Sequence, residues 1–374
     1  MKIIIQHSQF TDASGVKEHF FSGTSSAEKN FAAEAESLIA AYDEKCAETG
    51  VDRESEVLLR FHLSDITNQA HILEEILKGR DSFISVVGQP PANKSRIALE
   101  AWHWQGIKGK CVRDGKLKVT MNNCTALWFS NKKLNSRGSY EQTAEEFETL
   151  KTFLAEENAC VADNTMRTWL YCRDVDNNYA GLVTARNDFF SRNGLTKETH
   201  FIASTGIEGA AGEPHRLVKM DSISVPELST EQMIYLNAEK MLSPTAIYGV
   251  SFERATRVVY GDRSHIFISG TASIDHKGVV VHPYDVEKQT HRMLDNIEAL
   301  LAEGDADKSD IRIATLYLRD IADADIVTKV IAERFGSELP LVVLKAPVCR
   351  PAWLVEMECI AVNNKGSSAY FPFS

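Results

Sequence analysis

The hydrophobic and polar positions of this 374-residue chain follow the same order three times. Each time, a strand of alternating bulky residues ends in a small polar turn: EHFFSGTS at 18–25, CTALWFSN at 124–131 and SHIFISGTAS at 264–273. A long amphipathic helix and a strand that closes on an aspartate then follow, and the three aspartates are Asp65, Asp174 and Asp320. The pattern therefore predicts three copies of one unit, each long enough to be a domain, as in an oligomer fused into one chain.

The third copy shows the order of elements most clearly. Its first helix is predicted from the N-cap Asp285 to the stop at Gly304, because apolar residues recur there at helical spacing. Its other elements are a second helix at 324–335 and strands at 257–260, 265–269, 278–281, 311–318, 339–344 and 353–362. The same order in the other copies predicts helices at 31–48, 68–78, 139–157 and 179–192. The unit is therefore ββ(β)αβαββ.

This order predicts an α+β fold in which both helices of a copy cover one face of its sheet. The other face stays apolar, and three such faces can be buried against one another. We expect a pseudo-trimer with a central sheet barrel and the helices outside. The three copies are expected at 1–106, 107–240 and 241–374, and the linkers at 105–118 and 226–248, the second with a short helix around 231–241.

Composition excludes several classes of partner. Lys and Arg number 41 against 52 Asp and Glu, and the formal charge of −11 repels nucleic acid and anionic membranes. The seven cysteines include no CxxC pair, and no apolar run reaches the length of a membrane span or of a signal peptide core. The histidines show no metal-ligand spacing. We therefore expect a cytoplasmic protein without a metal or an organic cofactor.

Glu356 and Glu358 are the first candidates for chemistry. They lie two residues apart in a predicted strand, so both side chains should point to one face. Aligning LVEME with ALEAW and LVKMD sets Glu356 opposite Glu100 and Lys219, and Glu358 opposite Trp102 and Asp221. Divergence at these positions favours one specialised cleft, in which a buried Glu with a raised pKa could act as an acid. The alternative is a pair of surface charges on a half-exposed strand, which is about as common.

Three further features are candidates for substrate binding. Arg254 and Arg350 could each hold a carboxylate through a bidentate pair of hydrogen bonds. For Arg350, a structural salt bridge to Asp320 or another loop acid is equally compatible with the sequence. The glycine-rich segment that begins at Thr205 and Gly206 could form a nest of backbone N–H groups for an anion, or simply connect two strands. It lacks the lysine of a P-loop.

The third copy resembles the Rid family, also called YjgF or endoribonuclease L-PSP, through FISGTASID, DVEKQTHRMLDNIEALL, TLYLRDIAD and LVEMECIAV. The segments YLNAEKM, SFERAT, VCRPAWLVEME and FIASTGIEG are similar to the chorismatase branch of that superfamily. Rid proteins form homotrimers with ligand clefts between subunits, so the resemblance implies that this chain imitates such a trimer. It also implies a site role for Tyr248. The chain departs from the Rid pattern at residues 339–342, which are LPLV where imine hydrolases carry an arginine.

The resemblance implies an enzyme that acts on a small carboxylated substrate. Chorismatases hydrolyse the enolpyruvyl ether of chorismate, and this is the leading hypothesis, with Glu356 or Glu358 as acid or base. The first alternative is a Rid-type hydrolase of 2-imino or enamine acids, and the second is a non-catalytic metabolite-binding protein. Neither nucleic acid nor membrane is expected as a partner, and self-association beyond the internal pseudo-trimer is left open.

Overall fold

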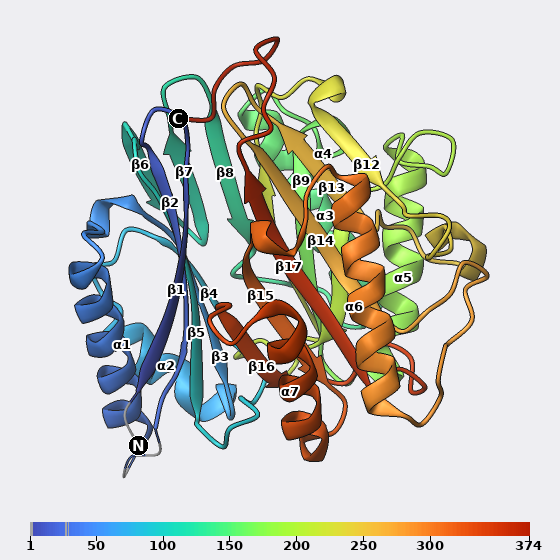
Figure 1. Ribbon diagram of the computed structural model, residues 1–374, viewed down its shortest axis with the longest axis horizontal. Helices are drawn as coiled ribbons and strands as arrows, with labels where there is room; N and C mark the ends of the chain where they lie inside the picture. Colours follow the sequence, from blue (N-terminus) through green and yellow to red (C-terminus); the bar gives the residue numbers. More distant parts are fainter. Residues whose placement is uncertain (1–2, 27, 29) are drawn as a thin grey trace.

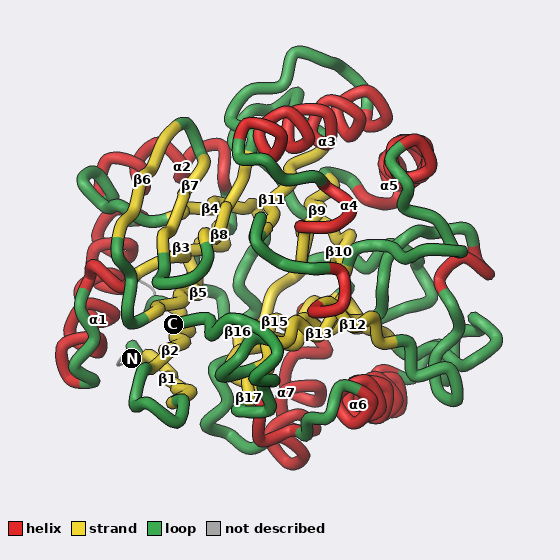
Figure 2. The backbone as a smooth tube through the Cα atoms, turned by 90° about the horizontal axis from the view of Figure 1, so that it is seen from above, coloured by secondary structure: helices red, strands yellow, loops and turns green. Residues whose placement is uncertain are grey.

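The computed structural model describes residues 3–26, 28 and 30–374, and within these ranges the chain forms three mixed sheets. Figure 2 shows the strands gathered in the interior and three groups of helices on the outside. Figure 1 shows the first copy, in blue, on one side, and the third copy, in orange and red, beside the green second copy on the other. The expected α+β fold is confirmed. None of the described helices is long and apolar enough to cross a membrane.

The first sheet contains five strands in the order β1-β2-β5-β3-β4. Its strands are β1 (Ile4–Thr11), β2 (Lys17–Thr24), β3 (Glu56–Leu63), β4 (Phe83–Gly88) and β5 (Ile97–Trp104). The helices of this copy are α1 (Phe31–Glu48) and α2 (Ile66–Ile76). Only β3 and β4 are parallel, because α2 crosses between them, and all other pairs are antiparallel.

The second sheet repeats this order and adds one strand at its edge, giving β10-β9-β11-β8-β7-β6. Its strands are β6 (Gly109–Arg113), β7 (Lys116–Thr120), β8 (Thr125–Ser130), β9 (Thr165–Cys172), β10 (Ala203–Glu208) and β11 (Val218–Ser224). Its helices are α3 (Ser139–Glu156), the short α4 (Val161–Asn164) and α5 (Val175–Arg192). The pair β9 and β10 is parallel, like β3 and β4.

The third sheet has the order β12-β13-β14-β17-β15-β16. Its strands are β12 (Met233–Leu236), β13 (Ala255–Val259), β14 (Ser264–Ala272), β15 (Ile311–Leu318), β16 (Leu341–Lys345) and β17 (Val355–Asn363). Its helices are α6 (Val286–Glu303) and α7 (Ala324–Phe335). Because β12 pairs with β13, the third sheet begins before residue 241. The three domain boundaries themselves stay a prediction.

The strongest amphipathic patterns were located correctly. Helices α1 and α7 span the predicted ranges, and α6 begins after Asp285, whose side chain accepts a hydrogen bond from the backbone N–H of Lys288 at 3.0 Å. Short or weakly apolar elements were predicted wrongly. The expected linker at 105–118 contains the β6–β7 hairpin, and the expected helix at 231–241 is a 3-10 turn followed by β12. The expected strand at 278–281 contributes only an isolated bridge, between Val280 and Ile274.

The three sheets enclose one shared core. A single cluster of buried side chains draws on all three copies, and Trp102, Trp128 and Trp169 follow one another within it at ring distances of 6.0 and 6.4 Å. The expected barrel is not a closed cylinder of hydrogen-bonded strands. Each sheet keeps two edges, and the described contacts between sheets include isolated bridges such as Gly88 to Ala210 and Ile207 to Val348.

The strand register corrects the alignment of the three copies. Glu100 lies opposite Arg60 and Glu358 lies opposite Thr315, so Glu358 corresponds to Glu100 rather than to Trp102. Asp221, opposite Trp169, is their counterpart in the second copy. The carboxylate at this position is therefore repeated three times. The position of Glu356 is occupied by Lys219 in the second copy and by Ala98 in the first, so its divergence is greater than the sequence alignment indicated.

The three repeated carboxylates link the copies in a cycle. Each carboxylate is contacted by a residue of the preceding copy. That residue stands five positions before the strand-closing Asp of its own copy. These contacts are Arg60 to Asp221 at 3.8 Å, Trp169 to Glu358 at 2.8 Å and Thr315 to Glu100 at 2.5 Å. Because all three carboxylates are buried, these contacts supply part of the polar environment that buried charges require.

Candidate active site

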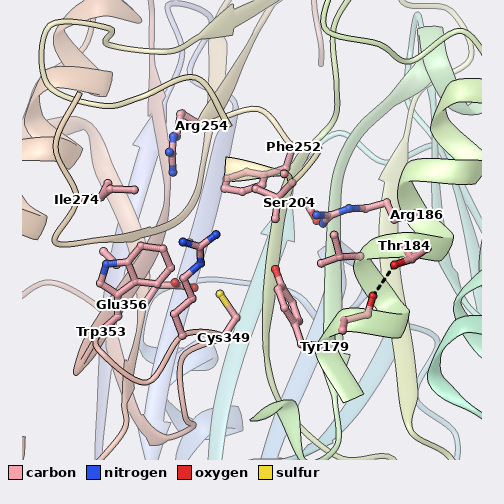
Figure 3. A pocket seen from close by; sticks show the side chains of 18 residues that line it. Tyr179, Thr184, Arg186, Ser204, Phe252, Arg254, Ile274, Cys349, Trp353 and Glu356 are labelled. Carbon is pink, nitrogen blue, oxygen red and sulfur yellow. Dashed lines mark hydrogen bonds between the residues drawn. The ribbon is translucent and has the colours of Figure 1, made fainter. Parts of the chain in front are cut away.

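A cavity of about 320 Å³ lies between the second and third copies. Helix α5 and strand β10 line it from the second copy, and strands β14 and β17 with their neighbouring loops line it from the third. The side chains that enter it are both apolar and charged, as is usual for sites that bind small molecules. Figure 3 shows Arg254 and Arg186 approaching from different sides, with Cys349 placed between Glu356 and Tyr179.

Glu356 on β17 lines this cavity and is only 6% exposed. Burial raises its pKa from 4.5 to about 8, the negative charge of Glu358 adds to the effect, and Arg254 and Arg167 oppose it. Within the described residues, no hydrogen bond to its carboxyl oxygens accompanies these effects. Gly270 makes room for this side chain, because a Cβ there would collide with a carboxyl oxygen of Glu356. Near neutral pH, Glu356 is therefore a buried, mostly protonated acid beside open space.

Glu358 has a different environment, although it lies only two residues further along β17. Its carboxylate forms an ion pair with Arg167 at 2.7 Å and accepts hydrogen bonds from Trp169 at 2.8 Å and from the Thr205 hydroxyl. These three donors belong to the second copy, and Glu358 faces the interior between the sheets rather than the cavity. The structure thus separates the two carboxyl groups that the sequence pattern treated as a pair.

Three arginines line the cavity. Arg254 donates two hydrogen bonds to the carbonyl of Ser243, at 2.9 and 3.2 Å, and its guanidinium lies 5.2 Å from the ring centre of Phe252. Arg186 lies 6.0 Å from the same ring, and Arg350 lies 5.4 Å from the ring of Trp353. Stacking on aromatic rings orients guanidinium groups without neutralising them. The cavity therefore combines one protonatable carboxyl group with several fixed positive charges.

Tyr179, Arg186 and Cys349 line the cavity but were not among the predicted site residues. Tyr179 and Arg186 are seven residues apart in α5, on the face that meets the third copy. The signal in the sequence that could have identified them was the presence of polar residues at helical spacing on a helix face that was expected to pack against the rest of the protein. Burial raises the pKa of the Cys349 thiol to about 12, which keeps it protonated.

The predicted residues Thr205, Gly206 and Tyr248 have different positions. Gly206 lines the cavity, and a Cβ there would lie 3.0 Å from the ring of Tyr179. Thr205 points away from the cavity, to Arg167 and Glu358. Both lie in β10, so the expected loop is a strand as far as Glu208. Tyr248 ends a 3-10 turn, and its side chain lies outside the described part of the structure. No group of three possible metal ligands occurs among the described residues.

Comparison with known proteins places these features in a family. The model of the family "Endoribonuclease L-PSP" matches residues 252–363. A RutC family protein of Pyrococcus abyssi is 34% identical over 100 residues, which are 26% of this chain and 79% of that protein. A 3-hydroxybenzoate synthase of Streptomyces hygroscopicus is 31% identical over 125 residues, 30% of this chain and 36% of that protein. A crystal structure of chorismatase matches 82% of this chain and 93% of its own with a TM-score of 0.65 and 20% identity.

The chain therefore belongs to the endoribonuclease L-PSP family, the Rid superfamily that includes the RutC proteins. Over most of its length the chain has a fold similar to that of the chorismatase structure, so within this superfamily it is chorismatase-like in fold. Both parts of the resemblance seen in the sequence are confirmed.

Proposed function

We propose that the chain is a chorismatase-like hydrolase that cleaves the enolpyruvyl ether of chorismate, or of a closely related dicarboxylate, in the cavity between the second and third copies. The observation that carries the proposal is the buried position of Glu356 at the wall of this cavity, where burial raises its pKa to about 8. A carboxyl group with a pKa of about 8 holds its proton near neutral pH and is still acidic enough to transfer it. The chorismatase fold supports the same assignment.

The charges of the cavity fit a dianionic substrate. Arg254, Arg350 and Arg186 lie on its wall and can donate hydrogen bonds to carboxylates. Phe252 and Trp353, which stack with these arginines, offer flat apolar surfaces to a six-membered ring. A volume of about 320 Å³ is at the lower end of the range for small-molecule sites. The proposed substrate anchors are therefore Arg254 and Arg350, with Arg186 as a third.

The reaction proceeds in three steps from this arrangement. Glu356 transfers its proton to the terminal methylene carbon of the enol ether, which leaves a positive charge shared by the ether carbon and oxygen. Water then adds to that carbon and returns a proton to the Glu356 carboxylate. The resulting hemiketal loses its hydroxyl proton as the bond to the ring oxygen breaks, and the ring oxygen takes up a proton. The products are pyruvate and the ring alcohol, and Glu356 is protonated again.

Glu358 supports Glu356 without touching the substrate in this scheme. Its negative charge helps to keep the proton on Glu356, and its ion pair with Arg167 fixes the strand that carries both residues. Glu358 is accordingly a positioning residue, and Thr205 acts through it.

The test is release of pyruvate from chorismate, followed continuously with lactate dehydrogenase and NADH. We expect turnover by the wild-type protein and a loss of at least 100-fold in Glu356→Gln, because general acid catalysis contributes about that much or more. Glu146→Gln is a matched control, because Glu146 is also buried with a pKa raised to about 7 but does not line the cavity. Per folded molecule it should keep its activity, although loss of the ion pair with Arg216 should lower its stability. Absence of pyruvate with the wild-type protein, or full activity of Glu356→Gln, would overturn the proposal.

The main alternative to the chorismatase-like reaction is Rid-type hydrolysis of an imino or enamine acid, and the assays must distinguish the two. A 3-aminoacrylate deaminase RutC of Acinetobacter baylyi is 29% identical to this chain over 97 residues, which are 26% of this chain. That activity would appear as faster ammonia release from 2-aminoacrylate generated in the assay. The LPLV segment at 339–342, which opens β16 without an arginine, favours the chorismatase-like reaction. Thermal stabilisation by chorismate without turnover would instead indicate a metabolite-binding protein.

A further inference from the structure

The first sheet lacks a strand that the other two sheets have. In the second sheet β6 pairs with β7, and in the third sheet β12 pairs with β13, both times antiparallel. Strand β1 is the counterpart of β7 and β13, since each of the three pairs antiparallel with the next strand along the chain. No described strand pairs with the other side of β1, so the first sheet has five strands where the others have six.

The free edge of β1 carries unpaired backbone groups. Within the described residues, the backbone hydrogen bonds of this strand are those to β2, and none connects its other side to another segment. The third copy meets β1 at the side chains of Gln6 and Ser8, which share one face of the strand. The Gln6 amide donates to the carbonyl of Ser337 at 3.1 Å, and the Ser8 hydroxyl donates to the carbonyl of Arg312 at 2.6 Å. These contacts hold one face of β1 and leave its edge open. Figure 1 shows β1 at the front of the molecule, between α1 and α7.

Strand β1 also lacks the features that protect exposed edges in natural sheets. Such edges carry charged side chains or prolines, or are very short, because an open edge pairs readily with another chain. Strand β6 carries Lys110 and Arg113, and β12 is four residues long. Strand β1 has eight residues, IIQHSQFT, without Lys, Arg, Asp, Glu or Pro. Its one titratable side chain, His7, is neutral at pH 7, because burial lowers its pKa to about 4.

The three remaining sheet edges are met by a neighbouring copy. Isolated bridges connect β4 to Ala210, β10 to Val348 and β16 to Pro91. Of the six edges of the described sheets, β1 is therefore the one that is long, uncharged and uncovered. A sixth strand for the first sheet has to come from outside the described chain.

We propose that β1 pairs with β1 of a second copy of this chain, so that two pseudo-trimers form a dimer about a two-fold axis. Such an axis makes the two strands antiparallel, which is the orientation of β6 and β12 in the other two sheets. An uncharged strand meets its own copy without charge repulsion at the contact. Because the pairing uses the free edge of both copies, assembly stops at the dimer. The proposal is independent of the reaction proposed for Glu356.

Sedimentation velocity of the full chain at concentrations from about 1 to about 200 µM tests the proposal. An interface made of one strand pair is small, so we expect a Kd on the order of 10 µM. Each copy carries a formal charge of −11, so about 0.3 M salt is needed to screen the repulsion between the copies. We expect mostly monomer at the lowest concentration and dimer, without larger species, at the highest.

Two substitutions locate the contact on β1. Ile4 is 71% exposed and Gln9 is also exposed, so lysine at either position leaves the core intact. Side chains of paired strands lie about 5 Å apart, so the added charges of the two copies repel each other. The double variant Ile4→Lys/Gln9→Lys should therefore raise the Kd about tenfold or more. Ile234→Lys is the matched control, because Ile234 is 42% exposed on the edge strand β12, and it should dimerise like the wild type.

Hydrogen exchange of the wild-type protein gives a second test that needs no variant. The backbone N–H groups of β1 that face away from β2 should exchange more slowly at the highest protein concentration than at the lowest, whereas exchange in β12 should not change. A wild-type protein that stays monomeric throughout, or β1 exchange that is independent of concentration, would overturn the proposal. A dimer that Ile4→Lys/Gln9→Lys leaves as tight as before would overturn it too, because the contact would then lie elsewhere.

Discussion

Replacing Glu356 by Gln should stabilise the folded protein, and the gain should grow with pH. In the unfolded chain this carboxyl group ionises near pH 4.5, whereas in the folded protein burial raises its pKa to about 8. Between these values folding must return a proton to Glu356, so the wild-type protein loses stability as the pH rises through this interval. Glutamine has nearly the same shape and does not titrate, so the variant does not lose stability as the pH rises through this interval.

The size of the effect follows from the same two pKa values. A difference from 4.5 to about 8 corresponds to a free energy of about 5 kcal/mol when fully developed, at about 1.4 kcal/mol per pH unit. The stability gain of Glu356→Gln over the wild type should therefore be small at pH 4.5, about 3 kcal/mol at pH 7, and close to its maximum above pH 9. Buried carboxyl groups that do not interact with Glu356 titrate equally in both proteins and cancel in the difference.

Urea unfolding of both proteins at pH 5, 7 and 9, followed by circular dichroism, measures this difference. Glu358→Gln is the matched control two residues away. Its replacement removes the partner of the buried Arg167, so it should destabilise the fold at every one of these pH values. A stability difference between Glu356→Gln and the wild type that does not change with pH would show that Glu356 ionises normally, and would remove the basis for its role as an acid.

Three further results are expected. Turnover should fall as the pH rises above about 8, because only the protonated form of Glu356 can donate; a rate that still increases at pH 9 would contradict this role. Arg167→Met should lower the free energy of unfolding by about 3 to 5 kcal/mol, since it leaves Glu358 buried without its ion-pair partner, and urea denaturation measures this loss. Gly115→Ala should cost about 1 to 3 kcal/mol by the same measurement, because Gly115 has a φ of 79° and a Cβ there lies 2.5 Å from the carbonyl of Ser130. Its pyruvate release should match the wild type, since the β6–β7 hairpin does not line the candidate active site.

Much of the scaffold could be predicted from the sequence because the pattern occurs three times. Long helices such as α1, α6 and α7 have many apolar positions at helical spacing, so their ends were located within a residue or two. The β6–β7 hairpin was missed because its outer strand is exposed and little apolar. Its Asp114-Gly115 turn, with both residues at positive φ, was the signal that could have revealed it.

The site was harder to predict because it is shared by two copies. Glu356, Arg254, Arg350 and Gly206 line one cavity, and their roles in a reaction stay a prediction. Sequence spacing could not separate Glu356 from Glu358, because the donors that hold Glu358 inside belong to β9 and β10, between 153 and 191 residues earlier in the chain. Nor could it place Glu358 opposite Thr315, since the pairing of β15 with β17 joins segments about forty residues apart in the chain and is not fixed by motif spacing.

The cycle of carboxylate contacts also constrains the order in which the chain can fold during synthesis. Glu100, in the first copy, accepts its hydrogen bond from Thr315, which lies 215 residues later. Asp221 similarly contacts Ser85, and Glu358 contacts Arg167 from the preceding copy. The inner face of the first sheet therefore stays incomplete until the third sheet has been synthesised. We expect closure of the ring of contacts to be the slow, late step of folding.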